Sequence, residues 1–130
     1  MAMTPRKNEQ SPAFNYHDFD LVKGLALRFP GTEEGVSHAG TPSVTVRGKL
    51  MCRLHDSGAF IPIRLDFALR DDYLERYPDV FHLPEHFRNY PYVCLWVHCR
   101  DKALLAEVLE HSWRGLAGRK QLKEFDSARA

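Results

Sequence analysis

Apolar and polar residues alternate through the stretch from Pro42 to Asp66, which has the clearest pattern in the chain. Glycines in Arg47–Gly48–Lys49 and Asp56–Ser57–Gly58 suit tight hairpin turns, which need a positive φ. The pattern predicts three antiparallel strands with one buried and one solvated face. Pro62 has no N–H to donate, so its strand is expected at a sheet edge or at a bulge. The residues expected on the buried face are Val44, Val46, Leu50, Cys52, Leu54, Ile61, Ile63 and Leu65.

Three other segments have apolar residues at helical spacing. The first begins at Asp18, which can cap it, and ends at Pro30–Gly31. The second follows Asp66 for about two turns and is ended by Pro78. The third follows Asp101 as its cap and has the longest stripe. That stripe consists of Leu104, Leu105, Val108, Leu109, Ser112, Trp113 and Leu116.

The remaining extended segments complete the predicted sheet. Residues 33–40 form a weakly patterned strand, and residues 80–83 a short one limited by Pro84. From Tyr92 to Cys99 both alternating sets are fairly apolar, as in a strand covered on both faces, so this strand is expected inside the sheet. The order helix, strands, helix, strands, helix is that of an α+β domain.

Length and composition predict a single domain. A chain of 130 residues can bury one hydrophobic core without the disulfide bonds or metal ions that smaller domains need. Residues 1–14 are polar and aperiodic and are expected to be a flexible N-terminal tail. Residues 15–118 are expected to form the domain, and residues 119–130 a C-terminal surface tail that either frays or lies on the surface.

Charge and cysteine usage narrow the class of protein. Eighteen basic against seventeen acidic residues give a net charge of +1, so any basic site must be local. The chain has no apolar run of membrane-spanning length and no signal-peptide core, which predicts a cytoplasmic protein with no membrane partner. Three cysteines, an odd number, fit reduced and packed thiols better than a disulfide framework.

Catalytic and metal-binding patterns are weak. The best metal candidates are His82, His86, Cys94, His98 and Cys99. Pro84 separates the first two, and the last two are adjacent on a strand and point to opposite faces. The sequence contains no Gly-x-Ser-x-Gly elbow and no P-loop. We therefore expect no catalytic residues, no metal and no cofactor, and a protein that is not an enzyme.

A basic set and an aromatic loop are the two candidate sites. Strand alternation places five residues on the solvated face: Arg47, Lys49, Arg53, His55 and Arg64. Solvated faces are usually charged, which is the simpler explanation; the functional one is a phosphate-binding surface. Four residues near the C-terminus could extend that surface: Arg114, Arg119, Lys120 and Lys123.

The segment from residue 85 to 91 is polar, aromatic and prone to turns, so it is a second candidate recognition site. The residues expected to bind a ligand there are His86, Arg88, Tyr90 and Trp96. Trp113, in contrast, lies on the apolar stripe of the last helix and is expected in the core.

Several short motifs, in this order and spacing, resemble the MmcQ/YjbR family of small bacterial proteins. They are Phe29–Pro30–Gly31 with Glu33–Glu34, Arg47–Gly48–Lys49, Tyr77–Pro78–Asp79–Val80–Phe81, His86–Phe87–Arg88–Asn89–Tyr90–Pro91 and Ser112–Trp113–Arg114. The resemblance implies a CyaY-like, secretion-chaperone-like fold, a twisted antiparallel sheet with helices packed on one face, without known catalytic residues or cofactor. Members are commonly labelled DNA-binding.

These observations leave two functional hypotheses. The first is a non-enzymatic protein that binds DNA weakly and without sequence specificity through the basic sheet face. The alternative is a protein-interaction or small-ligand module that uses the loop from His86 to Tyr90.

Overall fold

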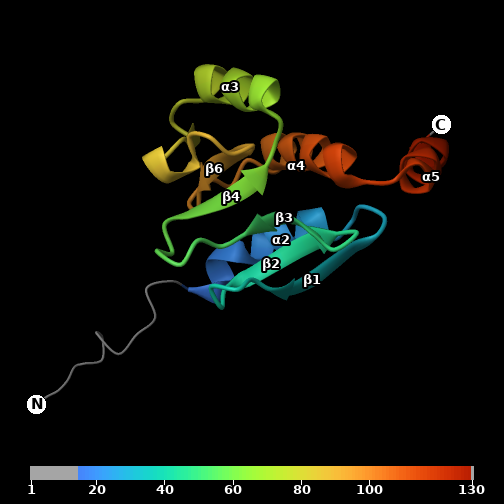
Figure 1. The fold of residues 1–130 in the computed structure, drawn as a ribbon, viewed down its shortest axis with the longest axis horizontal. Helices are drawn as coiled ribbons and strands as arrows, with labels where there is room; N and C mark the ends of the chain where they lie inside the picture. Colours follow the sequence, from blue (N-terminus) through green and yellow to red (C-terminus); the bar gives the residue numbers. More distant parts are fainter. Residues whose placement is uncertain (1–14, 130) are drawn as a thin grey trace, which may run out of the picture.

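Within residues 15–129, which the computed structural model describes, six antiparallel strands form one open sheet in the order β1-β2-β3-β4-β6-β5 (Figure 1). The strands are β1 (Thr32–Val36), β2 (Pro42–Val46), β3 (Lys49–Arg53), β4 (Phe60–Arg64), β5 (Phe81–His82) and β6 (Tyr92–Trp96). The three predicted central strands are confirmed, and β6 lies inside the sheet as expected. The N-terminal tail predicted for residues 1–14 falls outside the described residues.

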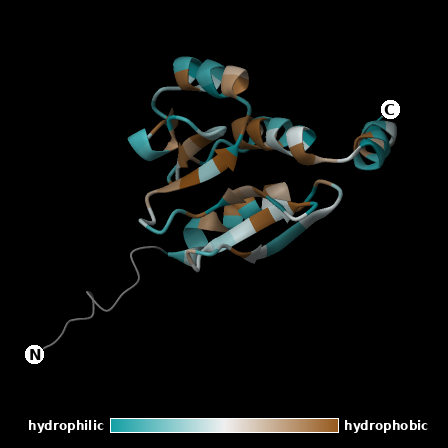
Figure 2. Cartoon of the chain, in the orientation of Figure 1, coloured by the Kyte–Doolittle hydropathy of each residue, from teal (hydrophilic) through white to brown (hydrophobic). Residues whose placement is uncertain are grey.

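The α-helices cover one face of this sheet, which confirms the α+β prediction. They are α2 (Asp20–Ala26), α3 (Phe67–Arg76), α4 (Lys102–Leu116) and α5 (Arg119–Arg129). Two 3₁₀ turns lie outside this layer: η1 (Tyr16–Phe19) precedes α2, and η2 (Glu85–Phe87) lies in the loop between β5 and β6. Helix α4 packs on β3 and β4, α2 packs on α4 and β2, and α3 packs on β5 and β6. In Figure 2 hydrophobic colours concentrate on α4 and the central strands, whereas α5 is mostly hydrophilic.

Side-chain caps fix the starts of α3 and α4. Asp101 accepts a hydrogen bond from the Leu104 amide, as expected, and Asp66, for which no cap was predicted, accepts one from the Leu69 amide. The prediction for Asp18 is wrong. Asn15 caps the first turn instead, because its side chain accepts from the amide of His17, and Asp18 lies within η1.

A β-bulge in β3 changes the predicted register. Val44 lies opposite Cys52 and the next residue, Thr45, lies opposite Leu50, so Met51 is an extra residue without a partner on β2. Met51 and Cys52 are both fully buried on the helix side, whereas Leu50 turns to the other face and is half-buried. The prediction that Leu50 is buried and Met51 solvated is therefore wrong. The other seven predicted core residues are buried: Val44, Val46, Cys52, Leu54, Ile61, Ile63 and Leu65.

Pro62 was expected at a sheet edge or at a bulge, and the first alternative is wrong because β4 lies between β3 and β6. The amide of Leu65 donates to the carbonyl oxygen of Pro91, and the amide of Val97 donates to that of Ala59. The N–H and C=O groups of odd-numbered residues in this segment therefore point toward β6, and those of even-numbered residues point toward β3. The nitrogen of Pro62 therefore faces β3, where the ladder is paired only at Cys52 and Ile63. The missing donor is tolerated because the β3–β4 pairing is interrupted beside it.

The C-terminal segment, which was expected to fray or to lie on the surface, forms the surface helix α5, and one of its side chains packs against the core. Trp113 is fully buried, and its indole nitrogen donates to the carbonyl oxygen of Pro30 at 2.8 Å. Phe125 of α5 packs on the rings of Phe29 and Trp113, with centroids 5.4 and 4.9 Å away. The helix thus lies on the surface but is anchored by one aromatic cluster.

The bulge predicts unequal costs for two neighbouring substitutions. Met51→Gln should lower the free energy of unfolding by about 2 to 4 kcal/mol, because it puts an unpaired amide into a closed core. Leu50→Gln, at a half-exposed position, should cost about 1 kcal/mol or less. Urea unfolding followed by circular dichroism measures both. A larger loss for Leu50→Gln would mean that β3 has no bulge at Met51.

Thiol burial predicts that one cysteine reacts in the folded protein. Cys52 and Cys94 are buried, and burial raises the pKa of each thiol to about 12, so neither forms the reactive thiolate at pH 8. Cys99 is only half-buried. A coloured aromatic disulfide reagent should titrate about one thiol per native chain and all three in urea. Cys99→Ser should abolish the native reaction, and a fast reaction of all three thiols in the parent would contradict the burial.

Candidate functional site

The five residues predicted to form one basic face are divided between the two sides of the sheet. Arg47 sits in the two-residue turn between β2 and β3 with φ 53, and its Nη1 donates to the carbonyl oxygen of Leu116 at 3.4 Å. Lys49 lies opposite Val46, which is buried on the helix side, and residues paired across strands share a face. Arg47 and Lys49 therefore belong to the helix side, and the prediction of a single basic face is wrong.

Arg53, His55 and Arg64 remain on the outer face, but they do not make it strongly basic. The guanidinium of Arg64 lies over the ring of Tyr92, 5.9 Å from its centroid. The imidazole of His55 stacks on Phe60 at 4.3 Å. Burial lowers the pKa of His55, more than its neighbour Asp56 raises it, so the ring is neutral at pH 7. This face therefore carries two guanidinium groups and no third cation from the predicted set.

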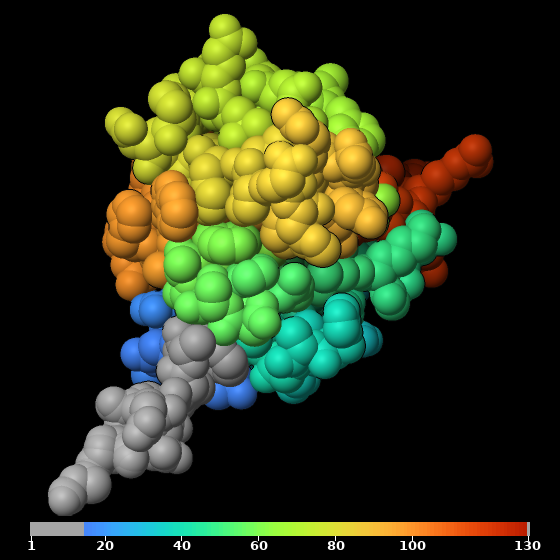
Figure 3. All heavy atoms as spheres, turned by 60° about the vertical axis from the view of Figure 1, so that its left-hand side comes forward, coloured from blue at the N-terminus to red at the C-terminus, as the bar shows by residue number. Residues whose placement is uncertain are grey.

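The two residues that leave the outer face join cations of α5. The side chain of Arg47 lies beside Gly118: a Cβ atom built on this glycine would be 3.7 Å from the Arg47 side chain. Helix α5 begins at the next residue, Arg119. Figure 3 shows the turquoise hairpin tip beside the red C-terminal helix. We call this cluster the basic corner; it consists of Arg47, Lys49, Arg119, Lys120 and Lys123.

The cations of the basic corner have no acidic partner among residues 15–129. All five side chains are exposed, and within that range none of them forms an ion pair. Lys123 follows Arg119 by four residues and Lys120 by three on α5, so its side chain neighbours both of theirs on the helix surface. The corner therefore keeps its charge available for an external anion.

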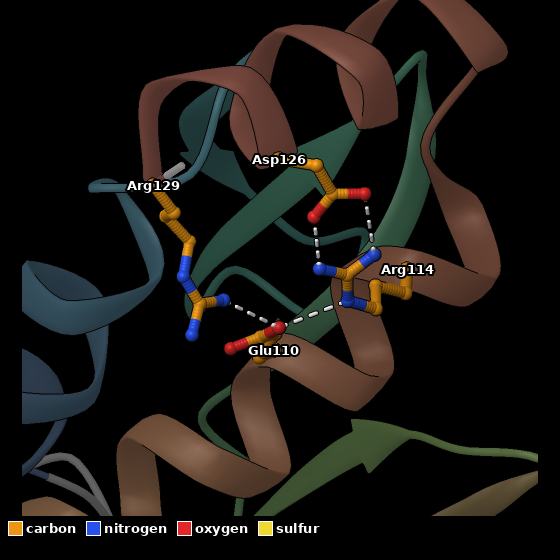
Figure 4. Close-up of polar contacts among 4 residues, drawn as sticks. All are labelled: Glu110, Arg114, Asp126 and Arg129. Atoms are coloured by element: carbon orange, nitrogen blue, oxygen red, sulfur yellow. Dashed lines mark hydrogen bonds and ion pairs between the residues drawn. The ribbon is translucent and has the colours of Figure 1, made fainter.

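Arg114, which was expected to add to the basic surface, is neutralised. It donates to Asp126 of α5 at 2.6 Å and to Glu110 at 2.9 Å, and Arg129 donates to the same Glu110 at 3.0 Å (Figure 4). Hydrogen bonds to Asp126 and Glu110 raise the pKa of Arg114, and the bond from Arg114 lowers the pKa of Asp126. This network attaches α5 to α4 and so positions the cations of the basic corner.

The four predicted ligand-binding residues are brought together only in part. Arg88 points into solvent and pairs with Glu85 at 3.3 Å. The ring of Trp96, at the end of β6, stacks on the ring of His82 in β5, with centroids 3.6 Å apart. Neither ring lines the cavity that contains His86 and Tyr90. His86 and Tyr90 do line one cavity on the outer face of the sheet.

This cavity has a volume of about 170 Å³ and lies between the outer face of β3 and β4 and the loop that contains η2. It combines Arg53 from the predicted basic set with His86 and Tyr90 from the predicted ligand set. The other lining residues were not predicted from the sequence. Leu50 faces outward only because of the bulge, and the remaining ones come together only through tertiary contacts. The lining residues are His38, Leu50, Arg53, Pro62, His86, Phe87, Tyr90 and Tyr92.

Neither a metal site nor a membrane span is found in residues 15–129. In that range no three residues among the histidines, cysteines and acidic residues are grouped so that they could hold a metal ion. No helix of the described chain has the length and apolar character needed to cross a bilayer.

Comparison with known proteins gives one result. No curated protein and no solved structure matches the chain. The model of the YjbR family matches residues 27–115, which is most of the chain and spans β1 to the last turn of α4. That range contains the hairpin, loop and helix motifs on which the resemblance was based. The chain therefore belongs to the YjbR family.

Proposed function

We propose that this protein is a non-enzymatic DNA-binding protein that contacts the phosphate backbone through the basic corner. The observation that supports the proposal is that five exposed cations lie on the β2–β3 hairpin and on the first half of α5, two segments that meet where Arg47 passes Gly118, without acidic partners in residues 15–129. The N-terminal end of α5 adds the positive end of its helix dipole at the same place. Phosphate oxygens are the ligands that such a cluster of Lys and Arg attracts.

The size of the basic corner limits the affinity. Five cations on a convex edge can neutralise about three phosphates at once, which gives a slope of log K against log salt of roughly −3. The net charge of +1 adds no long-range attraction. Binding is therefore weak and independent of sequence, with a dissociation constant of about 10⁻⁴ to 10⁻⁶ M at physiological salt.

The non-enzymatic part of the proposal is supported by the contacts of residues whose pKa values are shifted: several of them form hydrogen bonds or ion pairs that join one helix to another. The hydroxyl of Tyr73 on α3 donates to Glu107 on α4, and burial and this bond raise the pKa of the phenol. Arg114 and Asp126 join α4 to α5 in the same way. Such ion pairs and hydrogen bonds between helices shift pKa values without any catalytic role.

Removing charge from the basic corner tests the proposal. The variant Lys49→Gln, Arg119→Gln, Lys120→Gln alters three exposed side chains that form no ion pair with residues 15–129, so it should fold normally. Fluorescence anisotropy with a labelled duplex, at 20 to 200 mM salt, should show the slope falling from about −3 to about −1, and binding weakened at least tenfold at low salt, because each phosphate contact contributes about 1 to the slope.

A matched control removes three positive charges elsewhere. Arg28→Gln, Arg100→Gln, Lys102→Gln changes the net charge by the same amount, and the last two of its positions lie at the opposite end of α4 from the corner. Its slope should stay near that of the parent. The proposal fails if the corner variant binds like the parent, if both variants lose binding equally, or if the parent shows no salt-dependent binding.

A further inference from the structure

We propose that the cavity on the outer face of the sheet is a binding site for a small aromatic monocarboxylate, with Arg53 as the residue that binds the carboxylate. The cavity lies on the opposite face of β3 from Lys49, so the site is separate from the basic corner. The inference rests on three features of the cavity: an unpaired guanidinium, an apolar lining of limited volume, and a loop that is fixed in place.

The guanidinium of Arg53 lacks an acceptor. It forms no hydrogen bond or ion pair with any residue from 15 to 129, and its Nη1 is shielded from solvent. A shielded charged donor without a partner is unfavourable, so an oxygen anion that accepts from Arg53 is stabilised. Because no Asp or Glu lines the cavity, nothing in its wall competes with such an anion.

Arg70 shows how this fold treats an arginine that has a structural role. Its side chain is almost fully buried, and its guanidinium bonds to Asp71 and to the carbonyl oxygens of Arg88 and Tyr90 at 3.0 and 3.1 Å. All of its contacts are made within the protein. Arg53 is the opposite case, an arginine placed at a cavity without any of these contacts.

The rest of the cavity selects the body of the ligand. Leu50, Pro62 and Phe87 supply apolar surface, and Tyr90 and Tyr92 add aromatic faces with hydroxyl groups. The volume of about 170 Å³ is close to the engineered cavity of about 150 Å³ that binds benzene, so it fits one ring. One guanidinium balances one negative charge, which favours a carboxylate over a doubly charged phosphate.

The loop over the cavity is held in place before any ligand arrives. The bonds from Arg70 to the carbonyl oxygens of Arg88 and Tyr90 fix its second half. The ring of Phe87 is buried and meets Phe60 and Tyr92 edge-on at 6.1 Å. A cavity whose wall is already ordered loses little conformational entropy on binding.

Titration of the ¹⁵N-labelled full chain with benzoate tests the inference. Saturable shifts should appear for the amides of residues 50–53, 86–90 and 92 in the parent. Arg53→Met should weaken binding at least tenfold and leave the thermal unfolding temperature unchanged or higher, because it removes an unpaired buried donor. Arg64→Met, an outer-face cation that does not line this cavity, is the matched control and should bind like the parent.

Two further ligands separate the ring from the charge. Benzyl alcohol has the ring without the charge, and inorganic phosphate has charge without a ring; both should bind at least tenfold more weakly than benzoate. If benzyl alcohol binds as tightly as benzoate, Arg53 does not bind the carboxylate. If phosphate binds as tightly as benzoate, the cavity binds anions without recognising a ring. Either result would overturn the inference. No saturable shifts with benzoate, or unchanged binding in Arg53→Met, would overturn the inference. If Arg53→Met unfolds, Arg53→Lys can be used instead. It keeps the positive charge but loses the planar guanidinium that can donate two hydrogen bonds to a carboxylate, so it should bind benzoate more weakly than the parent.

Discussion

One extra residue in β3 decides which side chains each face of the sheet presents. With strict alternation, Lys49 and Arg53 would share the outer face and Met51 would lie between them. The bulge instead places Met51 in the core beside Cys52 and moves Lys49 to the helix side. The predicted basic surface is thereby split into a convex corner and a single arginine at a cavity, and Leu50 becomes part of the cavity wall.

Local signals in the sequence predicted the elements well because those elements depend on neighbouring residues. Alternation located β2, β3 and β4, the change to helical spacing after Asp66 located α3, and Asp101 was recognised as the cap of α4. The bulge was missed because Leu50, Met51 and Cys52 are three apolar residues in succession, and such a run is compatible with either register. That run was the one available sign that the alternation breaks there.

Long-range contacts account for the rest of what the sequence concealed. The pair Glu110 and Arg114 is four apart on a helix and could be expected, but Asp126 and Arg129 reach it only because α5 folds back. That return depends on Phe125 packing against an aromatic cluster from α2's end and α4. Composition and spacing show mainly the charges of residues 119–129, which predict a segment that frays or lies on the surface.

The two arginines near the cavity show why a binding residue could not be recognised from residue type. Arg70 and Arg53 have the same chemistry, but one is saturated by carbonyl oxygens of the loop and the other meets no acceptor in residues 15–129. The contrast extends to the two proposed sites. The cavity, with a volume of about 170 Å³, has room for one ring and not for a nucleic-acid backbone, and the basic corner has exposed cations without an apolar lining. Since the sites lie on opposite faces of one hairpin and share no residue, a ligand in the cavity covers none of the cations of the basic corner.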